Sequence, residues 1–186
     1  MTRPEIPKKP VPPYPILIRD TRVVAGFGRG SSEIGIPTAN IPIEDTPELE
    51  TLPTGVYFGF IKLNKPSPSV TPEPEIKKRL DGKSEIEFTY GQNLQPKDLS
   101  ILPMVMSLGW NPFFKNEKKA CEIHIMHDFK SDFYGCSLSF NILGYLRPEL
   151  DYVSVELLIK DIQTDIKIAL DHLKLEEYNS CKKQLI

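Results

Sequence analysis

Six strand-length apolar segments, bounded by Gly, Pro or Asn residues, constrain the fold of this chain more than any other feature. They are Ile16–Val24, Ile36–Ile43, Val56–Leu63, Met104–Leu108, Ala120–His127 and Ser137–Leu146. Short apolar runs between turn-forming residues are typical of β-strands. Because no helical segment separates them, the pattern predicts an all-β fold: a six-stranded antiparallel sheet closed on itself as a barrel.

The two ends and one internal stretch depart from this pattern. Prolines at positions 4, 7, 10, 12 and 13 predict that residues 1–14 form an extended arm on the surface or a loosely ordered one. Residues 64–103 are too many for a plain hairpin connection, so we expect an insertion, with one extra strand at Glu85–Tyr90. The domain is expected to span 15–175, and 176–186 to be a tail that includes solvated lysines.

A helix is predicted near the C-terminus. Apolar residues recur at helical spacing from Val155 to Leu173, and Ser154 is a suitable N-cap. We expect this helix to pack on one face or end of the barrel, and we assign no chemistry to it.

Composition excludes some classes of function. The chain has 186 residues, with 23 basic and 25 acidic side chains and a net charge of −2. Without a dominant basic stretch, a dedicated nucleic-acid or membrane-surface binder is not expected. Three cysteines without CxxC spacing predict unpaired thiols in a reducing compartment. No secretory signal or membrane-length apolar run is evident, so we expect a cytoplasmic protein.

The glycine-rich stretch 26–40 is a candidate phosphate loop. Backbone N–H groups of such a turn form an anion-binding concavity, to which an arginine adds charge. The residues concerned are Gly26, Gly28, Arg29, Gly30 and Ser31. The spacing fits neither a Walker loop nor a dinucleotide fingerprint, and a tight hairpin without a ligand is an equally good interpretation.

Thr38 and Asn40 follow this loop at positions i and i+2, which places both side chains on one face of a strand. Hydroxyl and amide oxygens are hard ligands that suit Mg²⁺. Glu122 lies in an alternating segment whose Ile123 and Ile125 form the apolar face. A carboxylate there is either a general base for a hydroxyl group or part of a solvated face.

Two further segments allow alternative interpretations. Trp110 and the phenylalanines that follow it, within residues 109–116, either cap the core or line a slot for a flat ligand. Arg147, next to a proline at the end of the last strand, either holds a polar edge of a ligand or pairs with Glu149.

Taken together, these motifs resemble those of riboflavin kinases (flavokinases). In order, they are Gly-Phe-Gly-Arg-Gly-Ser, Gly-Ile-Pro-Thr-Ala-Asn, Thr-Gly-Val-Tyr, Gly-Trp-Asn-Pro, Glu-x-His-Ile, Asp-Phe-Tyr-Gly and Tyr-Leu-Arg-Pro-Glu. The resemblance runs from about residue 16 to 173. It implies Greek-key connectivity and transfer of the γ-phosphoryl group of ATP to the 5′-hydroxyl of riboflavin, which yields FMN.

The resemblance also implies roles for particular residues. Thr38 and Asn40 would hold a divalent metal (Mg²⁺ or Zn²⁺), and Glu122 would be the catalytic carboxylate. The arch from Gly26 to Ser32, with Gly28, Arg29, Gly30 and Ser31, would enclose the ATP phosphates. Phe133 and Tyr134 would lie near the nucleotide, and Arg147 would belong to a loop on the flavin side.

We expect a kinase alone, without a fused adenylyltransferase, acting as a monomer on riboflavin and ATP. The competing hypotheses are a flavin-binding barrel without catalysis and an oligonucleotide-binding barrel. The net negative charge weighs against the second.

Overall fold

The computed structural model describes residues 2–26, 35–79, 82–110, 115 and 117–186. In these ranges the main sheet is antiparallel, with strand order β1-β8-β3-β6-β7-β2 and with β9 paired to β3. Its strands are β1 (Ile16–Arg22), β2 (Ala39–Ile41), β3 (Gly55–Leu63), β6 (Leu102–Trp110), β7 (Lys119–Ile125), β8 (Ser137–Ile142) and β9 (Gly144–Arg147).

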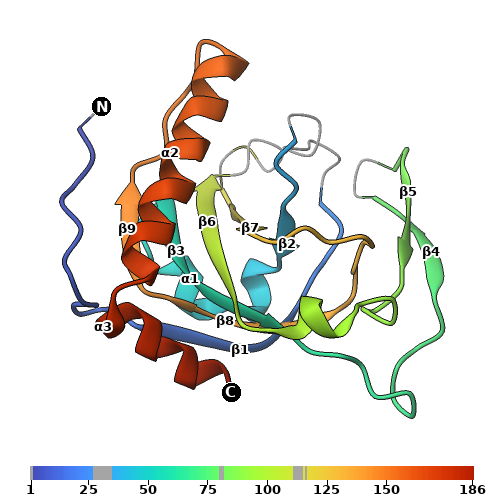
Figure 1. Ribbon diagram of the computed structural model, residues 1–186. Helices are drawn as coiled ribbons and strands as arrows, with labels where there is room; N and C mark the ends of the chain where they lie inside the picture. The colour runs from blue at the N-terminus through green and yellow to red at the C-terminus, as the bar shows by residue number, and fades with distance from the viewer. Residues whose placement is uncertain (1, 27–34, 80–81, 111–114, 116) are drawn as a thin grey trace.

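The sheet curls into a barrel (Figure 1). An antiparallel bridge between Val24 and Asn40, with N–H···O 3.0 Å, links the end of β1 to β2, so the two edges of the sheet meet. The predicted antiparallel barrel is confirmed. The segment predicted as one strand over 137–146 is divided at Leu143, whose N–H donates to the carbonyl of Phe58.

Alternating side chains build two cores on opposite faces of the sheet. Along β7, Cys121, Ile123 and Ile125 point into the barrel and are buried. On β3 both faces are covered: Tyr57 packs inside the barrel, whereas Phe58 packs outside it. This double burial requires a second layer on the outer face of the sheet.

Helix α2 (Val155–Leu173) provides most of that layer and crosses β3, β6 and β9 (Figure 1). It begins as predicted, because the Ser154 Oγ accepts a hydrogen bond from the Leu157 N–H at 3.3 Å. Ala169 and Leu173 pack against the outer core. None of the helices in the described ranges combines the length and apolar composition of a membrane span.

The prediction of a tail over 176–186 is wrong. Helix α3 (Glu176–Asn179) and the 3-10 helix η5 (Ser180–Leu185) continue from α2 and cover β3 and β8. Tyr178 and Leu185 are buried there. Elements this short leave no periodic pattern in the sequence, and the apolar surface that they cover is made by distant strands.

Residues 2–15, the described part of the proline-rich arm, contain no helix or strand, as predicted, and run beside α2 and α3 (Figure 1). Its Pro7 carbonyl accepts a hydrogen bond of 2.7 Å from the Tyr178 hydroxyl. Arg3 contacts α2 farther along. The arm is therefore bound to the surface of the domain.

The insertion forms a hairpin beside the barrel (Figure 1). The predicted strand is confirmed as β5 (Glu85–Phe88), and its partner β4 (Glu75–Lys78) was not predicted. Three short helical turns lie between strands: η2 (Ile43–Asp45), α1 (Pro47–Glu50) and η3 (Pro96–Leu99). All three cysteines are free thiols, as expected.

Candidate active site

A row of polar side chains crosses the outer face of the barrel over three neighbouring strands. Asn40 on β2 is directly opposite Glu122 on β7, and Glu122 is opposite Ser107 on β6. Opposite residues of an antiparallel pair project to the same face. Thr38 and Asn40 share one face, as the alternation in the sequence predicts, and the register of β2 with β7 places Glu122 on that face.

Glu122 is held by Thr38. The Thr38 hydroxyl donates to Glu122 Oε1 at 3.1 Å, so one carboxylate oxygen has a fixed partner. Burial raises the pKa of Glu122, and the hydrogen bond from Thr38 acts in the opposite direction because it favours the charged form. The result is a carboxylate that is more basic than an exposed one and has a defined orientation.

The beginning of the glycine-rich stretch lies against this group. A Cβ atom on Gly26 would overlap the amide of Asn40 and would lie 2.9 Å from its Cγ. Any larger residue at this position would displace the Asn40 amide from its place in the row. Gly28, Arg29, Gly30 and Ser31 lie outside the described residues, so their predicted role as an arch stays a prediction.

Two cavities flank the group formed by Thr38, Asn40 and Glu122. One, of about 300 Å³, has Thr38, His127, Phe133 and Tyr134 in its wall. The other, of about 660 Å³, has Gly26, Asn40, Trp110 and two lysines in its wall. Volumes of this order suit small-molecule ligands. Thr38 lies in the wall of the smaller cavity and Asn40 in the wall of the larger one, so the two cavities meet β2 at successive positions along the strand.

The smaller cavity has an aromatic wall that is held by a hydrogen bond between His127 and Asp98. His127 Nε2 lies 2.7 Å from Asp98 Oδ1, and the ring of Phe129 packs on both His127 and Phe133 with centroids 4.7 Å apart in each case. The predicted Phe133 and Tyr134 are thus placed beside the candidate site. Asp98 comes from the insertion, and nothing in its local sequence indicates this contact.

Trp110 faces outward, with half of its side chain exposed and Lys119 Nζ 5.5 Å from its ring. It lines the larger cavity, so of the two interpretations of this aromatic the one in which it lines a ligand slot fits better. The phenylalanines at 113 and 114 lie outside the described residues.

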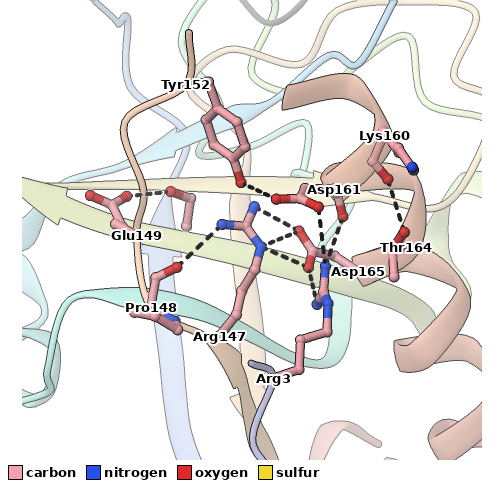
Figure 2. Close-up of polar contacts among 10 residues, drawn as sticks. Arg3, Arg147, Pro148, Glu149, Tyr152, Lys160, Asp161, Thr164 and Asp165 are labelled. Carbon is pink, nitrogen blue, oxygen red and sulfur yellow. Dashed lines mark hydrogen bonds and ion pairs between the residues drawn. The ribbon is translucent and has the colours of Figure 1, made fainter. Parts of the chain in front are cut away.

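Arg147 pairs with Asp165 of α2, not with Glu149. Its Nε donates to Asp165 Oδ1 at 2.9 Å and its Nη2 donates to Oδ2 at 2.9 Å (Figure 2). The side chains are 4% and 2% exposed, respectively. Helix α2, expected to serve packing alone, therefore supplies the counter-ion of a predicted site residue.

Glu149 lies on the outer face of β6. Its Oε1 accepts a hydrogen bond of 3.0 Å from Ser107, and a Cβ atom on Gly109 would overlap the carboxylate. Partial burial raises the pKa of Glu149, and the charge of nearby Glu122 adds to that effect. The polar row thus includes a second carboxylate, that of Glu149, which the sequence suggests solely as a partner for Arg147.

Comparisons with known proteins agree with the motifs. The profile of the flavokinase family, described as riboflavin kinase, matches residues 13–173. The chain is 53% identical over 184 residues to a riboflavin kinase of Scheffersomyces stipitis, covering 98% of this chain and 99% of that one. It is 47% identical over 183 residues to the riboflavin kinase of Saccharomyces cerevisiae, covering 97% and 82%. The crystal structure of a riboflavin kinase from Trypanosoma brucei, 20% identical, has a similar fold with a TM-score of 0.59, covering 93% and 86%.

Proposed function

The chain belongs to the riboflavin kinase family and phosphorylates riboflavin with ATP to give FMN, and we propose that Glu122 is its catalytic carboxylate. The observation that carries this proposal is the position of Glu122 beside Thr38 and Asn40. Phosphoryl transfer depends mainly on positioning and on charge neutralisation. The Glu122 carboxylate can position the acceptor hydroxyl, and the oxygens of Thr38 and Asn40 can hold a cation that neutralises phosphate charge.

Glu122 acts as the base for the acceptor. As the 5′-oxygen of riboflavin attacks the γ-phosphorus of ATP, its proton passes to the carboxylate of Glu122 and ADP departs. Thr38 orients the carboxylate through Oε1, and burial makes it a better proton acceptor at neutral pH than an exposed glutamate. The general-base role thus needs no covalent intermediate.

A divalent metal fits the adjacent residues. Enzymes of this family use ATP with a divalent cation, and we assign Thr38 Oγ1 and Asn40 Oδ1 as its protein ligands. These hard oxygens suit Mg²⁺, whereas Zn²⁺ favours sulfur and imidazole nitrogen. When bound, the cation neutralises charge on the ATP phosphates.

The nucleotide is proposed to bind on the β2 side of Glu122. The aromatic wall with Phe133 and Tyr134 would contact the base of ATP. The loop would enclose the phosphates with Gly26, Gly28, Arg29, Gly30 and Ser31. The guanidinium of Arg147 is paired with the carboxylate of Asp165. We therefore propose that Arg147 holds the flavin-side segment after β9 in place and does not contact the flavin. We also propose that the chain acts as a monomer.

The function is tested by incubating the chain with riboflavin and Mg-ATP and separating the flavins by chromatography. We expect stoichiometric formation of FMN and ADP. Riboflavin binding, seen by fluorescence quenching, without any FMN would instead support a carrier. Salt-sensitive binding of single-stranded oligonucleotides without FMN formation would support the nucleic-acid alternative.

Replacing Gly26 with alanine should raise the KM for Mg-ATP about tenfold, because the new Cβ displaces the Asn40 amide from its place beside Glu122. Gly82→Ala is a control away from the site, since Gly82 is in the insertion and a Cβ there meets nothing within 4 Å. Because its φ of +70° makes alanine strained there, thermal unfolding is recorded for both variants. Steady-state kinetics at saturating riboflavin measures the effect. An unchanged KM for Mg-ATP would remove Asn40 from the metal site.

Replacing Thr38 with valine should shift the acid limb of the kcat profile to higher pH. Glu122 must be ionised to accept a proton, so kcat falls as the pH drops through its raised pKa. The hydrogen bond from Thr38 lowers that pKa, and its loss therefore raises it further. Thr38→Ser keeps the hydroxyl and should retain the wild-type profile. An acid limb that does not move in Thr38→Val would show that Glu122 is not the titrating base.

A further inference from the structure

The N-terminal arm is connected to helix α2 by a charged contact that spans the sequence. Arg3 Nη1 donates to Asp165 Oδ1 at 2.7 Å, and Nη2 donates to the Asp161 carbonyl at 3.3 Å (Figure 2). Arg3 precedes the part of the chain matched by the family profile, which begins at residue 13. Arg3 is therefore outside the region matched by the profile, whereas its partners on α2 lie inside it.

Asp165 is shared by two guanidinium groups. Arg3 approaches one side of its carboxylate while Arg147 binds both oxygens from the other side (Figure 2). Asp165 is 1% exposed, and a buried carboxylate is stable when paired and hydrogen-bonded. The Asp161 carboxylate lies 4.0 Å from Arg3 Nη2. The group therefore contains two arginines and two aspartates, and its formal charges cancel.

From Arg147 the connection continues into the segment that leaves β9. Arg147 Nη1 donates to the Pro148 carbonyl at 3.2 Å, which fixes the backbone immediately before Glu149. The Glu149 carboxylate then accepts from Ser107, which is the residue opposite Glu122 on β6. Figure 2 shows Arg3, Asp165, Arg147 and Pro148 linked by these contacts and the hydrogen bond of Glu149 as a separate one. The peptide bond between Pro148 and Glu149 connects the two.

Glu149 and the proposed metal ligands lie on opposite sides of Glu122. Strand β7 lies between β2 and β6, so Glu122 has the proposed metal ligands on its β2 side and Glu149 on its β6 side. If ATP approaches from β2, the polyol chain of riboflavin must reach Glu122 from the β6 side. Carboxylates accept strong hydrogen bonds from hydroxyl groups.

We propose that Arg3 is a positioning residue for riboflavin, which acts through Asp165 and Arg147 to hold Glu149 where it accepts a hydrogen bond from a hydroxyl of the polyol chain. The proposal rests on the proposed function of Glu122. The N-terminal arm is then a part of the acceptor site, although it contacts neither substrate.

The test compares Arg3→Ala with Lys8→Ala, which removes the same charge from an exposed position of the same arm. Arg3→Ala should raise the KM for riboflavin about tenfold and leave the KM for ATP within about twofold. Lys8→Ala should match wild type, and Arg3→Lys should lie between because it keeps the charge but not the second hydrogen bond. Thermal unfolding is recorded so that kinetics are measured on folded protein.

The route is tested with Glu149→Gln. If Arg3 acts through Glu149, adding Arg3→Ala to Glu149→Gln should change the KM for riboflavin by less than about twofold. An unchanged KM for riboflavin in Arg3→Ala, or equal rises in both KM values, would overturn the proposal. The proposal would also be overturned if the effects of Arg3→Ala and Glu149→Gln on the KM for riboflavin were fully additive in the double variant. These outcomes are distinct from failure of the proposed function, in which the wild-type chain forms no FMN or Glu122→Gln keeps its turnover.

Discussion

Replacing Glu122 with glutamine should lower kcat about 10³-fold, which is within the usual contribution of a general base. Glutamine keeps the size of the side chain and can still accept the hydrogen bond from Thr38, but it cannot take up the proton of the acceptor hydroxyl. Because the substitution leaves Thr38 and Asn40 in place, the affinity for Mg-ADP should change by less than about twofold.

The measurement combines initial rates of FMN formation with calorimetric titration of Mg-ADP. Glu48→Gln is a matched control, because Glu48 is exposed on α1 and is not part of the polar row. Turnover near the wild-type value in Glu122→Gln would reject Glu122 as the base. A loss of both turnover and nucleotide affinity would instead place Glu122 in the metal site.

Replacing Asp165 with alanine should lower the free energy of unfolding by about 3–5 kcal/mol, the usual cost of removing one partner of a buried ion pair. Arg147 is 4% exposed and would lose its counter-ion while remaining inside the protein. Arg3 would lose its closer carboxylate and keep Asp161, and its side chain is more accessible. The result is uncompensated positive charge between α2 and β9.

Urea denaturation of the variant and of Asp171→Ala measures this effect. Asp171 is exposed on the same helix, so its replacement controls for the gain in helix propensity that alanine brings. We expect the control to lie within about 0.5 kcal/mol of wild type. A loss below about 1 kcal/mol in Asp165→Ala would show that the pair is no more important than a surface ion pair.

Much of the fold follows from local patterns in the sequence. Alternation in residues 120–127 predicts both the strand and the side from which Glu122 projects, because the period of a strand is two residues. Ser154 and the helical spacing after it predict where α2 begins. Thr38 and Asn40 are predicted on one face by the same argument, and the register of β2 with β7 brings them to Glu122.

The contacts missed are those that depend on tertiary structure. Asp165 is one of several acidic residues on α2, and its role depends on which side of the helix meets β9. Asp98 reaches His127 from the insertion. The helix η5 was missed because six residues carry too little pattern, and its burial depends on an apolar surface made elsewhere. In each case the deciding partner is far away in the sequence.

A crystal structure with riboflavin and a magnesium complex of a non-hydrolysable ATP analogue tests the central claim most directly. We predict that the 5′-oxygen of riboflavin lies about 3 Å from the Glu122 carboxylate, with Thr38 and Asn40 as ligands of the metal. A 5′-hydroxyl that is bonded to a different residue and separated from Glu122 by the width of a strand, in a complex with an ordered γ-phosphate, would contradict the assignment.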